Sequence, residues 1–135
     1  MTTTTTTYVA PPGLLASPAF NHAVIKAGRP VHIAGQLAIA EDGSVVGVGD
    51  VEAQSERVWA QVRAVVEAAG GTMADLVKIT TYITDPDHVQ PVLQSRMRQF
   101  PEGQVPASAL LVVKALARPE FLVEIEAVAH IEAPG

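Results

Sequence analysis

The segment "GDVEAQSERVWAQVRAVVEAAGGTMADLVKITTYITD", residues 49–85, contains a helical pattern followed directly by a strand pattern. Asp50 is suited to capping the start of the helix, and Gly70 can end it in a left-handed conformation. From residue 75 to 84, apolar and polar residues alternate with the two-residue period of a strand. The segment therefore predicts a helix over 51–69 and a strand over 75–84. The apolar face of the helix, with its 3.6-residue period, comprises Val51, Val58, Val62, Val65, Val66 and Ala69.

The residues before this segment predict strands. Two short strands are expected at about 21–26 and 31–39, with a turn at 27–30 between them. The Asp42-Gly43 pair, flanked by apolar residues, predicts a hairpin that adds a further strand.

The residues after it predict one more helix and two more strands. A weaker helical pattern covers 86–99, with Pro86 in its first turn. Two apolar strands follow at 106–117 and 120–131, joined by a short turn at 118–119. The predicted order is β-β-β-α-β-α-β-β, an α+β domain in which two helices cover one face of a sheet.

Length and composition limit the protein class. The 135 residues predict a single domain over 13–132, with a flexible threonine-rich tail at 1–12 and a short tail at 133–135. Only 17% of residues are charged while 48% are apolar, which favours an oligomer that hides apolar surface. The net charge of −5 argues against nucleic-acid or anionic-membrane binding. No apolar run approaches the ~20 residues of a membrane helix, so a cytoplasmic protein is expected.

The strand "EFLVEIEAVAH", residues 120–130, carries two carboxylates. Strand alternation places Glu124 and Glu126 on the same face, opposite a wholly apolar face. If that face is covered, desolvation raises the pKa of a carboxyl group and suits it to proton transfer. If the face is wet, or if Lys78 or Lys114 pairs with these carboxylates, they are structural. The pattern alone leaves both interpretations open.

Other site motifs are weak. No phosphate-binding loop occurs, and the four histidines have no metal-binding spacing, so no metal site is expected. His130 shares the face of Glu124 and Glu126 and is best interpreted as a polar strand end. Ser108 lacks both the GxSxG elbow and an identifiable base, which disfavours a nucleophilic role.

Four stretches together resemble the RidA (YjgF) family, also called L-PSP endoribonuclease. They are "HIAGQL" at 32–37, the segment 49–85, "PAS" at 106–108 and "VEIEAVA" at 123–129. The resemblance implies a chorismate-mutase-like α+β fold with a mixed sheet, a homotrimer, and small-molecule clefts between subunits. It also implies hydrolysis of reactive imines and enamines to a 2-oxo acid and ammonia, without a cofactor.

The resemblance implies residue roles as well. Glu124 matches the glutamate that positions or activates the attacking water, and Gly35 matches a glycine that lines the cleft. Phe20 matches an aromatic residue near the N-terminus, and Ala107 belongs to the "PAS" motif. Ser108 takes the place of the arginine that binds the substrate carboxylate in active members.

This replacement removes two charge-assisted hydrogen bonds and leaves one neutral hydrogen bond. The loss of substrate binding is on the order of 2–5 kcal/mol. The leading hypothesis is therefore a RidA-like hydrolase or deaminase with altered substrate preference, in which Glu124 is the acid–base group. The alternative is a non-catalytic trimer whose vestigial cleft binds a metabolite. A ribonuclease ranks third because of the net charge.

Overall fold

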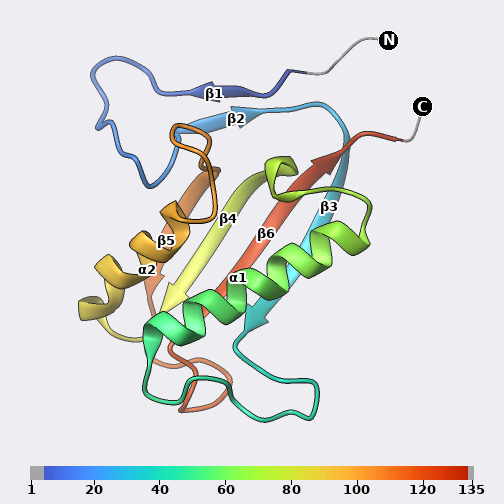
Figure 1. Cartoon of the computed structure of the whole chain (residues 1–135). Coiled ribbons are helices and arrows are strands. Elements are labelled where there is room, and N and C mark those ends of the chain that lie inside the picture. The colour runs from blue at the N-terminus through green and yellow to red at the C-terminus, as the bar shows by residue number, and fades with distance from the viewer. Residues whose placement is uncertain (1–4, 134–135) are drawn as a thin grey trace.

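The computed structural model describes residues 5–133. Its main feature is a four-stranded mixed sheet in the order β3-β6-β4-β5, with both α-helices on one face (Figure 1). Thus the α+β architecture with two helices on one side is confirmed. The elements in chain order are β1 (Thr7–Val9), β2 (Ala23–Ile25), β3 (Arg29–Leu37), α1 (Val51–Ala68), η1 (Met73–Asp75), β4 (Leu76–Ile83), η2 (Pro86–His88), α2 (Val89–Met97), β5 (Ala107–Val112) and β6 (Val123–Ile131).

Strand β6 lies between β3 and β4 and is antiparallel to both, whereas β4 and β5 are parallel. The expectation of a short turn between strands 106–117 and 120–131 is therefore wrong. Strand β5 ends at Val112, and residues 113–122 pass the end of β4 before β6 begins. The buried Gln54 side chain of α1 holds this connection by donating to the Glu120 carbonyl and accepting from the Leu122 amide, both at 2.8 Å.

The N-terminal residues also differ from the expectation. Strands β1 and β2 form their own two-stranded antiparallel sheet, in which Tyr8 lies opposite Val24. The strand expected at 21–26 thus pairs with residues of the expected flexible tail and not with 31–39. The rest of that tail at 1–4, and residues 134–135, lie outside the described residues. The Asp42-Gly43 turn forms, but the strand expected after it is reduced to one bridge between Ile39 and Val45.

Helix α1 follows the sequence prediction closely. The Asp50 carboxylate accepts a hydrogen bond from the Ala53 amide at 3.0 Å, and Gly70 has a positive φ of 97° just after the helix. The second helix is divided, because Pro86 and the next two residues form the 3-10 turn η2 before α2.

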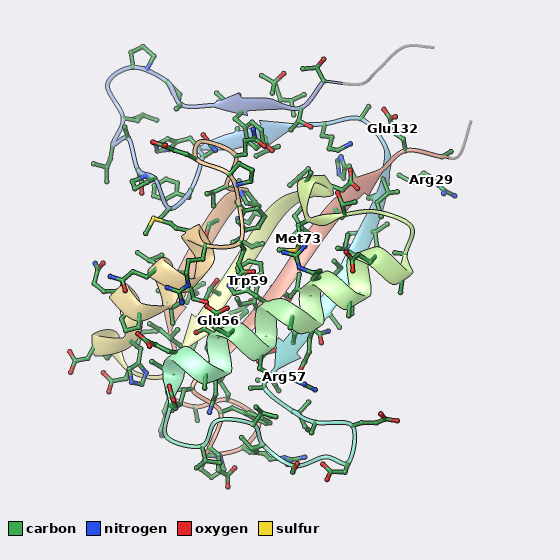
Figure 2. All side chains as sticks on the ribbon, in the orientation of Figure 1. Arg29, Glu56, Arg57, Trp59, Met73 and Glu132 are labelled. Atoms are coloured by element: carbon green, nitrogen blue, oxygen red, sulfur yellow. The ribbon has the colours of Figure 1, made fainter. Side chains whose placement is uncertain are left out.

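The core lies between α1, α2 and the sheet. The α1 residues Val58, Trp59, Val62 and Val66 pack against the apolar face of β6. Trp59 meets Phe100 edge to face, with ring centroids 5.5 Å apart. Figure 2 shows Trp59 and Met73 between α1 and the sheet. The opposite face of the sheet carries no helix in the described chain (Figure 1).

No helix in residues 5–133 is long and apolar enough to cross a bilayer.

Candidate functional site

The uncovered face of the sheet carries the two carboxylates of β6. Glu124 lies opposite Tyr82 of β4 and Leu37 of β3. Glu126, one pleat further along, accepts a hydrogen bond of 2.8 Å from the Tyr82 hydroxyl. This hydrogen bond raises the pKa of Tyr82. Strand alternation thus brings both acids onto one surface, as the sequence predicts.

A bulge in β3 places Gly35 against Glu124. The β3–β6 register shifts between Ile33 and Gln36, so two residues of β3 occupy the space of one pairing. A Cβ atom at position 35 would overlap the Glu124 carboxylate. Only glycine at this position leaves room for the carboxylate as it stands.

The electrostatics separate the two acids. Burial, followed by the neighbouring Glu126 charge, raises the pKa of Glu124 above the ordinary range of a carboxyl group. Within residues 5–133, neither carboxylate forms an ion pair with Lys78 or Lys114. Glu124 is half-buried and has no cation paired with it in the described residues, so its carboxyl group holds a proton more readily than a solvated one.

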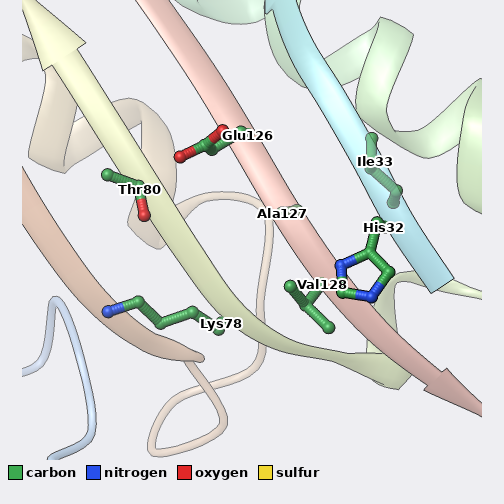
Figure 3. A pocket seen from close by; sticks show the side chains of 7 residues that line it. All are labelled: His32, Ile33, Lys78, Thr80, Glu126, Ala127 and Val128. Carbon is green, nitrogen blue, oxygen red and sulfur yellow. The ribbon is translucent and has the colours of Figure 1, made fainter. Parts of the chain in front are cut away.

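A hollow of about 240 Å³ lies beside Glu126 on this face. Figure 3 shows His32, Lys78, Thr80 and Glu126 around it, on strands β3, β4 and β6. The hollow is lined by the positive charge of Lys78 and the negative charge of Glu126. Glu124 does not line it.

Ser108 lies on the other face of the sheet. It pairs with Ile79 of β4, whose side chain belongs to the core under the helices. It lines a cavity of about 200 Å³ between β5, α2 and the segment before β2. Phe20 lines the same cavity, so the structure brings these two predicted residues together.

Arg96 of α2 also lines this cavity, and the sequence reasoning did not place it there. Only 2% of its surface is exposed. Its Nη1 donates to the Ala19 carbonyl at 3.2 Å and its Nη2 to the Thr81 hydroxyl at 3.0 Å. Burial lowers its pKa to about 10, so the guanidinium remains charged at neutral pH. A signal was available, because Arg96 follows Val92 by four residues and so falls on the buried helical face.

Four of the five predicted site residues thus form two groups on opposite faces of the sheet. Glu124 and Gly35 touch on the uncovered face, while Ser108 and Phe20 line the cavity under α2. Ala107 pairs with Lys78 at the end of β4 away from Tyr82, and it joins neither group.

Metal-binding side chains do not gather in the described part of the chain, where no group of three or more His, Cys, Asp or Glu side chains could hold an ion. His130 Nδ1 donates instead to the Lys26 carbonyl at 2.7 Å.

Comparison with known proteins identifies relatives of this chain. Residues 13–131 match the family model described as endoribonuclease L-PSP. The Rid-family protein YyfB from Yersinia pestis, of unknown function, is 34% identical, with a TM-score of 0.83 over 93% of this chain and 98% of that one. RidA from an Antarctic Psychrobacter is 31% identical, with a TM-score of 0.71 over 87% of this chain and 92% of that one.

Proposed function

The chain belongs to the endoribonuclease L-PSP family, which its Rid relatives share, and from this premise we propose that it hydrolyses a reactive imine or enamine. The observation that carries the proposal is the position of Glu124, a half-buried carboxylate with a raised pKa, seated against Gly35. No other acid in residues 5–133 combines a raised pKa with a neighbouring glycine that leaves space beside it.

In the proposed reaction the Glu124 carboxylate accepts a proton from water as the water oxygen bonds to the imine carbon. The proton then passes to the nitrogen, which gives a neutral carbinolamine. In a second transfer Glu124 carries the carbinolamine O–H proton to the nitrogen, the C–N bond breaks as the C=O bond forms, and ammonia leaves with a carbonyl compound as the second product. The reaction consumes one water and needs no cofactor. An enamine enters the same path after protonation at carbon gives the imine.

The two groups of site residues lead us to propose a homotrimer with a cleft between subunits. Glu124 of one copy and Ser108 of another would face the same cleft, since one sheet separates them within a chain. The exposed side chains of Leu111 and Val112 on edge strand β5 supply apolar surface for such contacts. The cytoplasm is the proposed location.

The test compares Glu124→Gln with Glu126→Gln, which makes the same charge change on the same face. Ammonia release from freshly generated imines should fall about 100-fold or more in Glu124→Gln. Glu126→Gln should stay within severalfold of wild type. Full activity in Glu124→Gln overturns the assignment. Light scattering should give three times the mass of one chain, and a monomer mass overturns the shared cleft.

One observation favours a second candidate, a metabolite-binding trimer without turnover. Ser108 supplies a neutral hydroxyl where the related motif has arginine. Binding of a small ligand by the wild type, with no ammonia release from any imine in the panel, would identify this candidate.

RNA cleavage, the activity named in the family's description, fits the negative net charge of this chain poorly. The net charge of −5 and the two adjacent carboxylates repel a phosphate backbone.

A further inference from the structure

We propose that the Tyr82 hydroxyl fixes the Glu126 carboxylate beside Glu124, and that Tyr82 is thereby a positioning residue for the proton transfer of Glu124. The catalytic meaning of this role rests on the proposed function, which it deepens by naming the groups that control the acid. The effect on the protonation of Glu124 is measurable without turnover.

The strand register brings the three side chains together. Tyr82 of β4 lies directly opposite Glu124 of β6, and Thr80 lies opposite Glu126. The Tyr82 side chain therefore reaches Glu126 diagonally across the two strands, where its hydroxyl donates to Oε1 at 2.8 Å. The two acids share one face of β6, with their Cα atoms about 7 Å apart along the strand. One tyrosine thus spans the positions of both acids.

The Tyr82 hydroxyl also senses both carboxylates. The hydrogen bond to Glu126, then burial and the charges of Glu126 and Glu124, raise the pKa of Tyr82. The hydroxyl is therefore protonated at neutral pH and remains a hydrogen-bond donor.

This hydrogen bond is what restrains Glu126. The Glu126 side chain is exposed, and within residues 5–133 its carboxylate makes no other hydrogen bond and no ion pair. Like charges on one face repel, so a free Glu126 carboxylate would turn into solvent, away from Glu124. Tyr82 opposes this movement. Burial and then the retained Glu126 charge raise the pKa of Glu124.

The other titratable groups of the uncovered face lie further from Glu124. His32 of β3 and Lys78 of β4 both lie opposite Val128, four residues along β6 from Glu124, or about 13 Å at the rise of a strand. His130 is six residues away along the same strand. Charges at such distances are largely screened by physiological salt. The residues that β5 adds to this face do not titrate; they are Ala107, Ala109 and Leu111.

The connection between β5 and β6 adds two cations near this end of the sheet. Lys114 and Arg118 line a different cavity together with Phe121. Neither forms an ion pair with Glu124 within the described part of the chain. Among the described residues, the charge that acts on the pKa of Glu124 is therefore that of Glu126.

The test follows the side-chain ¹³C carboxyl signal of Glu124 in a pH titration, with Glu124→Gln used to assign the signal. Tyr82→Phe removes only the hydroxyl, and the Glu124 midpoint should move to lower pH by on the order of a few tenths of a pH unit. Tyr8→Phe makes the same change at the other tyrosine, in β1, and should leave the midpoint in place. An unmoved midpoint in Tyr82→Phe, or an equal movement in Tyr8→Phe, overturns the proposal.

A double-variant cycle tests whether Tyr82 acts through Glu126. Glu126→Gln removes the charge and should lower the Glu124 midpoint at least as much as Tyr82→Phe does. In the Glu126→Gln background, Tyr82→Phe should have no further effect. A full additional shift would show that the hydroxyl acts on Glu124 directly and would overturn the positioning role. If Tyr82→Phe fails to fold, an unmoved midpoint in Glu126→Gln still overturns the proposal.

The pH profile of ammonia release separates this role from the proposed function. In Tyr82→Phe the acidic limb of kcat/KM should move to lower pH, because Glu124 then loses its proton at lower pH. A shifted Glu124 midpoint without ammonia release from any imine refutes the hydrolase and leaves the positioning role standing. Ammonia release that depends on Glu124, with an unmoved midpoint in Tyr82→Phe, refutes the positioning role alone.

Discussion

Ser108 and Glu124 point to opposite sides of one sheet. Their partners on β4 are Ile79 and Tyr82, and these alternate between the covered and the uncovered face. One ligand can therefore contact both residues only if two copies of the chain supply one residue each, as in the proposed trimer.

This relationship predicts complementation between inactive variants. Ser108→Leu should be inactive because it fills the cavity, and Glu124→Gln because it lacks the base. Trimers refolded from an equal mixture should recover about a quarter of wild-type activity. Each proposed site combines Ser108 of one chain with Glu124 of another, and about one random combination in four holds both wild-type residues. A mixture that stays inactive would show that the site is not shared.

The raised pKa of Glu124 predicts a pH-dependent stability difference. Between the ordinary carboxyl value of 4.5 and the higher folded value, the folded state binds more protons than the unfolded state. The free energy of unfolding contributed by Glu124 therefore falls as the pH rises through this window. Glu124→Gln should gain stability relative to wild type from pH 4 to pH 7, as measured by urea denaturation. A difference independent of pH would contradict the shift.

The close approach of Gly35 to Glu124 predicts a coupled effect. Gly35→Ala should destabilise the protein by roughly 0.5–1.5 kcal/mol, because the new Cβ displaces only the end of the Glu124 side chain, which must leave its present rotamer. In a Glu124→Ala background the same change should cost far less, and a double-mutant cycle measures the difference. If the free-energy costs of Gly35→Ala and Glu124→Ala are additive, the cost of Gly35→Ala does not come from contact with the Glu124 side chain.

The hydrogen bond from Arg96 to Thr81 predicts a face-specific stability loss. Thr81→Val leaves one buried guanidinium N–H without its acceptor and should cost roughly 1–3 kcal/mol. Thr80→Val makes the same chemical change on the uncovered face and should cost little. Thermal unfolding of both variants provides the comparison, and equal losses would contradict the role of this bond.

Local periodicity predicted much of the fold. Helix α1, strand β4 and the alternating faces of β6 follow from apolar spacing and from the residues that cap or end them. Strand order did not follow, because β5 pairs in parallel with β4 while β6 passes between β3 and β4. Alternation within a strand says which residues share a face, but not which strand lies beside it.

The same limit applied to the site. The contact between Gly35 and the Glu124 side chain arises from a bulge in β3, and no residue pattern marks the bulge. Arg96 lies on the apolar stripe of α2, yet a charged residue there is ordinarily assigned to the surface, so its burial became visible only in three dimensions.

The central position of β6 also governs how the chain folds. Strands β3 and β4 are connected in the sheet only through β6, so the four-stranded sheet forms only when β6 pairs with both of them. During synthesis on the ribosome, β3, α1, β4 and β5 emerge first and expose the apolar surfaces that β6 later covers. Folding is therefore expected to be late and limited by long-range pairing, and the nascent chain passes through a stage prone to aggregation.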